Sequence, residues 1–400
     1  MNNKWFLSLT IFLFTLRLSA QDFESLQTQV SKDSIDYVAK GDDCLNKLYY
    51  LEAINWYQLA AEQGDAAAQC KLGLIYLSGR GVPRNLDEAL KWYQMSADQG
   101  YAEAQSALCF LYCYGYGVQQ DYSEALMWGL KAAKQGDVDS QYYVGVIYAQ
   151  GFGTAQNYTE AFKWLSLAAN QGDVRAQYDF GHLFFEGDGV PQNYEEALKW
   201  YRMSADQGFA EAQFRLGLLY YSGIAIQQNY SEAIKLFLLS ANQGHIRSQS
   251  YLGMMYNNAL GVAQNFCEGM KWYRKAADKG DSDAQSALGY MYLVGNCVEK
   301  DYKEAVRLFR LSVEQGNSGG QDNLGYMYQM GYGVSQDYKE AIRLYRLSAD
   351  QGDPRGQYNL GYMYHKGLGI SQDLNEAKRW YQLAAEQGDE DAIIALKHME

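Results

Sequence analysis

The 400-residue sequence has few histidines and none of the familiar catalytic or metal-binding motifs. Its four histidines, His182, His245, His365 and His398, are far apart in the chain, and no His-Glu-x-x-His spacing occurs. Neither Ser-x-x-Lys nor Lys-Thr-Gly, the motifs of serine β-lactamases, is present. Because catalysis needs convergent titratable groups, the sequence predicts no enzyme, no catalytic residues, no cofactor and no metal ion.

Basic clusters are also missing. The formal net charge is −13, the isoelectric point is near 4.9, and no run of Lys or Arg offers a footprint for phosphates. Nucleic acid is therefore not expected as a partner. An acidic surface of this kind keeps a chain soluble and favours basic partners, so we expect a monomer that binds proteins or peptides.

Long apolar stretches are confined to the N-terminus. Residues 1–20 contain Lys4, an apolar run from Trp5 to Leu16, and a candidate cleavage site after Ala20. This pattern predicts a secretory signal peptide, with the mature protein in the periplasm or secreted. An uncleaved membrane anchor is the alternative, although the run is shorter than the ~20 residues that span a bilayer. After cleavage we expect no transmembrane span.

What the chain does have is a strict repeat. A Gln-Gly dipeptide, once Lys-Gly, recurs every 36 residues, ending at Gly64, Gly100, Gly136, Gly172, Gly208, Gly244, Gly280, Gly316, Gly352 and Gly388. A fixed period of this length indicates a helical solenoid in which each repeat packs mainly on its neighbours. Such an array presents a long open surface that suits binding.

The first half of each repeat predicts one helix, here called helix A. In residues 65–78, small and apolar residues recur at spacings of three and four, which marks one buried face. Tyr76 closes this pattern, so Tyr292, Tyr328 and Tyr364 at the same position are expected in the core. A glycine at Gly73 and most of its equivalents predicts close approach of two helices.

The second half predicts an antiparallel helix B. Asn or Asp stands at Asn85 and its eight equivalents, always followed three residues later by Glu, as in Glu88. This is a capping-box pattern, in which the cap side chain and the Glu side chain each satisfy a free amide. Helix B is expected to end at Gly100, and a Gly-x-Gly-Val loop, such as 79–82, joins the two helices.

The six cysteines show no repeated pair. Cys44, Cys70, Cys267 and Cys297 lie in different repeats at unrelated positions, and Cys109 and Cys113 lie four apart on one predicted helix. No Cys-x-x-Cys motif occurs. Although an exported protein can form disulfides, the sequence favours small buried cysteines.

The pattern Ala-x-x-x-Leu-Gly-x-x-Tyr, then Gly-x-Gly-Val, then Asn/Asp-x-x-Glu-Ala-x-x-Trp-Tyr-x-x-Ala-Ala-x-Gln-Gly resembles the Sel-one-like repeats, relatives of the tetratricopeptide repeats. The resemblance implies an all-α, right-handed α/α superhelical solenoid of 36-residue helix-turn-helix repeats, with the A helices lining a concave face that holds proteins in assemblies. Some exported bacterial members resemble proteins with claimed cell-wall or β-lactam binding, but this chain lacks the motifs of β-lactam chemistry.

The expected domain organisation follows the repeat. Residues 1–20 form the signal peptide, 21–32 a loosely ordered segment, 33–64 a tetratricopeptide-like capping hairpin, 65–388 nine repeats, and 389–400 a C-terminal capping helix.

The variable positions of helix A predict the exposed groove. They are equivalent to Ala67, Cys70, Lys71, Leu74 and Ser78, which lie opposite the constant face. The candidate protein-binding residues at these positions are Tyr290, Tyr326, Tyr362, Asn323, Asn359, Tyr143, Arg215 and Tyr251. Tyrosines are frequent at interfaces, and asparagine amides can hold the backbone of an extended peptide. The alternative is recent duplication, because Gly-Tyr-Met-Tyr occurs three times, at 289–292, 325–328 and 361–364.

Two binding functions remain open. The first is an exported scaffold or adaptor that binds protein or peptide segments in the concave groove. The second is a cell-envelope protein that binds peptidoglycan or another glycan with the same aromatic groove.

Overall fold

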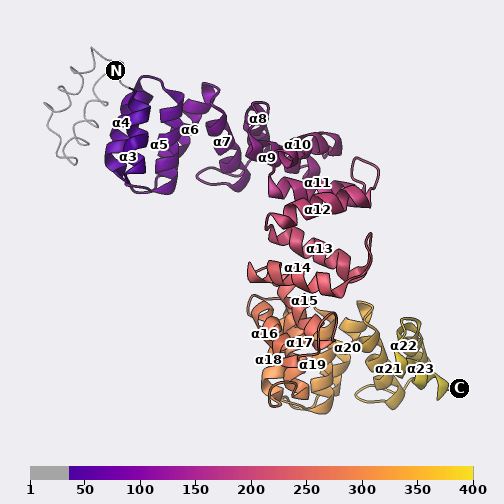
Figure 1. Cartoon of the computed structure of the whole chain (residues 1–400). Helices are drawn as coiled ribbons and strands as arrows, with labels where there is room; N and C mark the ends of the chain where they lie inside the picture. Colours follow the sequence, from indigo (N-terminus) through magenta and orange to yellow (C-terminus); the bar gives the residue numbers. More distant parts are fainter. Residues whose placement is uncertain (1–35, 400) are drawn as a thin grey trace, which may run out of the picture. The chain divides into compact units, whose positions relative to one another are not determined.

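The structure is a computed structural model that describes residues 36–399. Every regular element in these residues is an α-helix, as the repeat pattern predicts (Figure 1). The predicted signal peptide at 1–20 and the segment 21–32 lie outside the described residues. Contacts along the chain divide it into two compact parts, an N-terminal part up to Gln171 and a C-terminal part from Gly172.

The N-terminal part consists of four helical hairpins. Its helices are α3 (Tyr37–Asn46), α4 (Tyr50–Glu62), α5 (Ala66–Ser78), α6 (Leu86–Asp98), α7 (Ala102–Tyr114), α8 (Tyr122–Ala133), α9 (Val138–Gln150) and α10 (Tyr158–Asn170). From α5 onward, odd-numbered helices are A helices and even-numbered helices are B helices.

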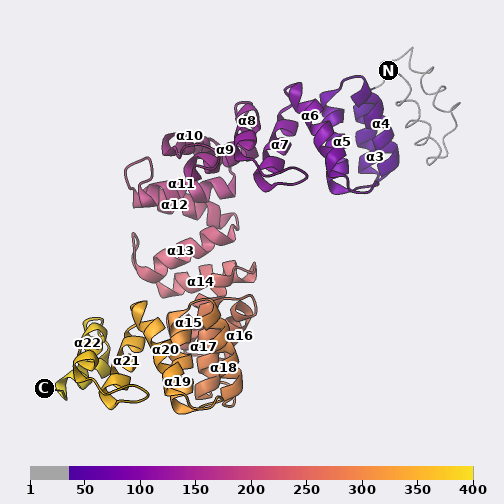
Figure 2. The same cartoon turned by 180° about the vertical axis from the view of Figure 1, so that it is seen from behind.

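The C-terminal part continues the same order, and Figure 2 shows it from behind. Its helices are α11 (Val174–Glu186), α12 (Tyr194–Asp206), α13 (Ala210–Ser222), α14 (Tyr230–Asn242), α15 (Ile246–Asn257), α16 (Phe266–Ala277), α17 (Ser282–Val294), α18 (Tyr302–Glu314), α19 (Ser318–Met330), α20 (Tyr338–Asp350), α21 (Pro354–Lys366), α22 (Leu374–Glu386) and α23 (Glu390–Lys397). The A helices α17, α19 and α21 contact one another in sequence.

The predicted helix caps are present, but one half of the capping box is wrong. Asn85 Oδ1 accepts a hydrogen bond from the Glu88 amide at 3.1 Å, as expected of an N-cap. The Asn85 amide, however, donates to the Tyr76 carbonyl at 2.9 Å, so it does not need the Glu88 side chain. Glu88 instead pairs with Lys91, three residues on. Helix A therefore caps helix B through its backbone.

The conserved glycine of helix A allows the close helix contact that the sequence predicts. A Cβ on Gly289 would lie 2.7 Å from the Phe309 ring, which is closer than real side chains approach. In the second complete repeat, Cys109 takes the glycine position and Gly129 replaces the facing ring. Cys109 and Cys113 are free and buried, which confirms that they pack and do not bridge.

In most repeats a buried glutamine connects the repeat to the one before it. In the repeat 282–317, Gln285 Nε2 donates to the Ala277 carbonyl of the preceding repeat at 3.3 Å. Gln285 Oε1 accepts from Gln315 Nε2, the glutamine of the Gln-Gly pair, at 2.9 Å. The recurring Gln-Gly is thus an inter-helix clamp as well as a helix end.

Two predictions about the faces of helix A need correction. Tyr292, Tyr328 and Tyr364 are only half-buried, because each hydroxyl reaches an exposed arginine of the preceding helix B. Conversely, the Cys70 position is not always part of the open groove. Its equivalents Phe214 and Asp322 are buried, since they face the neighbouring A helix.

Candidate functional site

The strongest candidate site lies on the A helices α17, α19 and α21. Tyr290 of α17 is 41% exposed, and its equivalent Tyr326 of α19 is half-buried. Both line a cavity of about 440 Å³, together with Asn323 and Asn359. The structure therefore brings together four of the eight residues that the sequence singled out. We call these four residues, with Lys300 and Arg355 of the same lining, the tyrosine groove.

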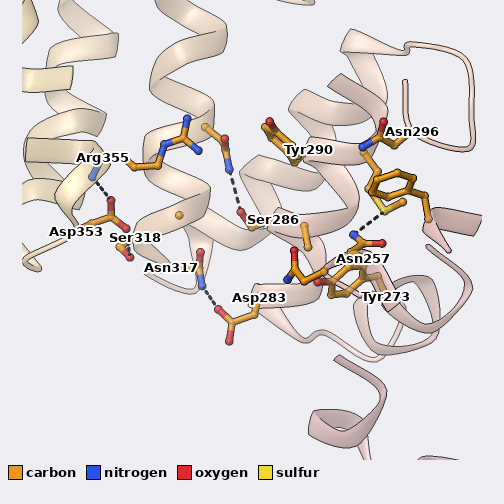
Figure 3. A pocket seen from close by; sticks show the side chains of 16 residues that line it. Asn257, Tyr273, Asp283, Ser286, Tyr290, Asn296, Asn317, Ser318, Asp353 and Arg355 are labelled. Carbon is orange, nitrogen blue, oxygen red and sulfur yellow. Dashed lines mark hydrogen bonds between the residues drawn. The ribbon is translucent and has the colours of Figure 1, made fainter. Parts of the chain in front are cut away.

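A neighbouring cavity of about 540 Å³ shares three residues of the tyrosine groove, namely Tyr290, Asn323 and Arg355 (Figure 3). Some of its polar side chains are already hydrogen-bonded to each other. Asn317 Nδ2 donates to Asp283 at 2.6 Å, and Ser318 Oγ donates to Asp353 at 3.2 Å. The two cavities adjoin at these shared residues, and Tyr290 and Arg355 stand on different helices.

The two asparagines link successive repeats. Asn323 Nδ2 donates to Ser286 Oγ at 3.2 Å, and Asn359 Nδ2 donates to Asp322 Oδ1 at 2.6 Å. These amide donors are therefore engaged in the fold. Only the remaining capacity of the two amides, chiefly their oxygens as acceptors, is left for the backbone of a bound peptide.

Charges in the tyrosine groove are of two kinds. Burial raises the pKa of Asp322 to about 6, although the hydrogen bond from Asn359 and the nearby Arg355 oppose that rise. The side chains of Lys300 and Arg355 are exposed, and within residues 36–399 neither forms an ion pair. The groove thus carries two available cations in a protein whose net charge is −13.

Sequence reasoning missed Arg355, Lys300 and Asp322. Arg355 stands at the Ala67 position, which the sequence did place on the groove, so its charge was available as a signal. Asp322 is the only carboxylate at the Cys70 position among the nine repeats, an exception visible in the sequence. Lys300 lies on the loop before α18, for which the helix pattern gives no orientation.

The other predicted site residues do not join this groove. Tyr362 is half-buried on α21 and lines neither of the two cavities. Arg215 is held by Glu186 at 3.2 Å and lies over the Phe185 ring. Tyr251 packs against Phe214 and Phe237.

Tyr143 lies in the N-terminal part of the chain, in a separate cavity of about 440 Å³.

The prediction that the cysteines only pack is wrong for one pair. Cys267 of α16 and Cys297 of the loop after α17 form a disulfide, with their Cα atoms 5.1 Å apart. They occupy different positions of two adjacent repeats, so a search for one repeated pair does not find them. Their neighbours Phe266 and Asn296 line the larger cavity. Cys44, Cys70, Cys109 and Cys113 are free.

Residues 36–399 contain no group of three or more His, Cys, Asp or Glu side chains that could hold a metal ion. None of their helices combines the length and apolar character needed to cross a membrane.

Comparison with known proteins identifies the family to which these repeats belong. The Sel1 repeat pattern matches residues 50–65 and then nine consecutive 36-residue segments from 66–101 to 354–389. The chain belongs to the Sel1 repeat family. Arrays of this family are scaffolds suited to protein–protein interaction, because the stacked repeats leave a long surface open.

Two solved structures show the same architecture. The c5321 protein of uropathogenic Escherichia coli, described as a protective antigen with an SLR fold, is 36% identical with a TM-score of 0.75. The alignment covers 86% of this chain and 73% of that one. A Sel1 repeat protein from Oxalobacter formigenes is 29% identical, with a TM-score of 0.53 and coverage of 86% and 90%. A search of curated proteins gave no match.

Proposed function

We propose that this protein is an exported bacterial scaffold that binds a segment of another protein in the tyrosine groove. The observation that carries the proposal is the convergence of Tyr290, Tyr326, Lys300 and Arg355 on one cavity. Tyr290 is 41% exposed, and the two cations have no ion-pair partner in the described residues. These side chains therefore contribute little to folding, whereas aromatic and arginine side chains dominate protein interfaces.

The chemistry of the groove favours an extended segment that carries acidic side chains. Lys300 and Arg355 supply positive charge, and Asp322 is buried behind them with a raised pKa. Tyrosine rings provide contact area at low entropic cost, and the asparagine oxygens accept hydrogen bonds from a backbone. Four repeats contribute residues to the two cavities, which suits a chain lying across them better than a small compact ligand.

Export is supported by the N-terminal sequence and by the disulfide between Cys267 and Cys297. Disulfides persist in oxidising compartments such as the periplasm. On the proposed model of action, the protein works as a monomer outside the cytoplasm and performs no chemistry on its partner.

The test compares the full chain with the double variant Tyr290→Ala, Tyr326→Ala. Both proteins are used to recover partners from periplasm and culture medium, and each partner identified by mass spectrometry is purified and titrated. Loss of two interface aromatics should weaken binding by about 2 kcal/mol or more, because such residues are common hot spots. Circular dichroism should show unchanged helicity, since both rings face the groove.

The matched control is Tyr194→Ala, which removes a 38%-exposed tyrosine from α12, outside the groove. It should leave partner binding unchanged. Equal binding by the double variant and the wild type would contradict the proposed groove. Binding of the wild type to purified cell wall, with no protein partner and with loss in the double variant, would favour the glycan-binding alternative.

A further inference from the structure

A second surface, in the N-terminal part, has the opposite charge to the tyrosine groove. A cavity of about 440 Å³ between α7 and α9 is lined by the rings of Phe110 and Tyr143 and by three carboxylates, Glu103, Asp137 and Asp139. No basic side chain is among its lining residues. The cavity therefore combines aromatic walls with negative charge.

Aromatic rings gather at its edge. The Phe110 ring lies 4.8 Å from that of Tyr114 and 5.8 Å from that of Tyr116. Tyr143 of the next repeat lies 6.2 Å from both Phe110 and Tyr114. Tyr114 and Tyr116 remain 56% and 46% exposed. We call Phe110, Tyr114, Tyr116 and Tyr143 the ring cluster.

The repeat fold does not require these rings. The position of Tyr114 holds Ser78 in the preceding repeat and Gln150 in the next. The position of Tyr116 holds Arg80 in the preceding repeat and polar or aliphatic residues in several later ones. Because equivalent helices form without them, exposed tyrosines at both positions are not explained by packing. A cluster of exposed aromatic residues on a soluble protein marks an interaction surface.

The carboxylates are held beside the rings by the local fold. Asp137 caps α9 and also accepts a hydrogen bond from Ser106 Oγ at 2.8 Å. Glu103 and Asp139 stand at the same repeat position on α7 and α9, and the Tyr101 hydroxyl is hydrogen-bonded to Glu103. A cation placed here would meet aromatic rings and carboxylates, and both attract positive charge.

We propose that the ring cluster, together with Glu103 and Asp137, binds an arginine side chain of a basic partner segment. A guanidinium group stacks on aromatic faces and pairs with a carboxylate through two parallel hydrogen bonds, which an ammonium group does not do. The overall charge of −13 draws a basic segment to the protein, and the cavity gives it one place to dock. This surface is separate from the tyrosine groove and does not depend on it.

The test is isothermal titration of the full chain with two probes, acetyl-(Gly-Arg)₃-amide and acetyl-(Gly-Glu)₃-amide. The arginine peptide should bind, with affinity falling as salt rises, and the glutamate peptide should not bind. The variant Tyr116→Leu keeps an apolar side chain but removes a ring, and leucine already stands at this position in Leu260 and Leu368. With Tyr114→Ser added, affinity should fall about tenfold, the size of a partly desolvated cation–π contact.

Matched controls separate a specific site from general attraction to an acidic protein. Phe152→Leu makes the same exchange at the equivalent position of the next repeat, where the 41%-exposed ring stacks on Tyr122 outside this cavity. It should leave affinity unchanged. Glu103→Gln should weaken binding and flatten its salt dependence. Tyr290→Ala with Tyr326→Ala should have no effect, whatever the fate of the tyrosine groove.

Three outcomes would overturn the proposal. They are equal binding of both peptides, a loss with Phe152→Leu as large as that with the ring variants, and full affinity after the ring substitutions.

Discussion

Two adjacent repeats of the C-terminal part, 246–281 and 282–317, share one backbone plan and differ in how completely they pair their buried polar atoms. The first leaves three such atoms without a hydrogen-bond partner among the described residues, namely Gln249 Oε1, Asn257 Oδ1 and Trp272 Nε1. The second leaves none. Each unpaired buried group costs roughly 1–3 kcal/mol, so the difference is large on the scale of protein stability.

Single exchanges within the repeat account for two of the three atoms. In the second repeat the buried Gln285 accepts a hydrogen bond from Gln315. In the first repeat Lys279 stands at the position of Gln315 and donates elsewhere, so Gln249 Oε1 has no donor. At another position Gly269 replaces alanine, and a Cβ there would clash with Asn257. In the next repeat the corresponding residues are Ala305 and Leu293, an apolar pair with no side-chain polar atom to be left unpaired.

The disulfide joins these same two repeats. Cys267 lies in the poorly paired repeat and Cys297 in the well-paired one. A covalent link restricts the unfolded chain and so stabilises the array without adding any contact. The repeat with the incomplete polar network is thus linked covalently to its well-paired neighbour.

The largest expected effect comes from removing that bond. In the variant Cys267→Ser, Cys297→Ala, both new residues already occur at equivalent positions, as Ser123 and Ala225. The cysteines are 30 residues apart, so the chain-entropy relation gives a loss of about 3–4 kcal/mol. Chemical denaturation should show it, and hydrogen exchange should show lower protection in α16 and α17 than in the helices of distant repeats.

Cys70→Ser is the control, because Cys70 is a free, half-buried cysteine in another repeat. It should change stability by far less. If the double variant kept wild-type protection in α16 and α17, the disulfide would not be what holds the poorly paired repeat.

The repeat pattern predicts most of this fold because each position meets the same neighbours nine times. The helix caps, the close approach at Gly289 and the free, packed Cys109 follow from spacing alone. Contacts between different repeat positions do not. The Cys267–Cys297 bond depends on how one repeat is placed on the next, and the backbone cap at Asn85 joins two different positions of the same repeat. Neither contact can be read from one repeat position alone.

The candidate site was predicted in part for the same reason. Tyr290 and Tyr326 occupy the same repeat position of helix A, so their common cavity follows from the period of 36 residues. Arg355 reaches the same cavity from a different repeat position and a different repeat. Tyr362 occupies the same position of helix A but packs against Tyr381 and Ala392 of the last two helices and does not line the cavity. A repeat position predicts the face of the helix on which a residue lies. The stacking of the helices decides which residues of that face contact one another.

The next repeat, 318–353, differs from both, because it buries the carboxyl group of Asp322 and pairs it with Asn359. Its pKa of about 6 in the folded protein lies above the ordinary 3.8. Between these values the folded state keeps a proton that the unfolded state has released, so stability falls as pH rises from about 4 to about 6. The shift corresponds to on the order of 3 kcal/mol, fully lost above that window.

The measurement is denaturation of the wild type and of Asp322→Asn at several pH values from 4 to 7. The stability difference between the two proteins should move in favour of the variant as pH rises. Asp283→Asn, which changes an exposed carboxyl group on α17, is the control for the loss of one negative charge. Parallel pH profiles for wild type and Asp322→Asn would show that Asp322 ionises normally in the folded protein.

The smallest effect restores the missing donor in the poorly paired repeat. Lys279 Nζ donates to the Gly244 carbonyl at 2.9 Å, and Gln387 makes the same bond to Gly352 while also donating to Gln357. Lys279→Gln should therefore keep the existing bond and pair Gln249, with a gain of about 1 kcal/mol. The reverse exchange, Gln315→Lys, should cost at least as much, because it leaves Gln285 Oε1 unpaired.

The stability of both variants is measured with the disulfide intact and with it removed. Equal gains in the two backgrounds mean that the glutamine clamp and the disulfide act independently. No gain from Lys279→Gln in either would mean that water already satisfies Gln249, and the contrast between the two repeats would then rest on Asn257 and Trp272 alone.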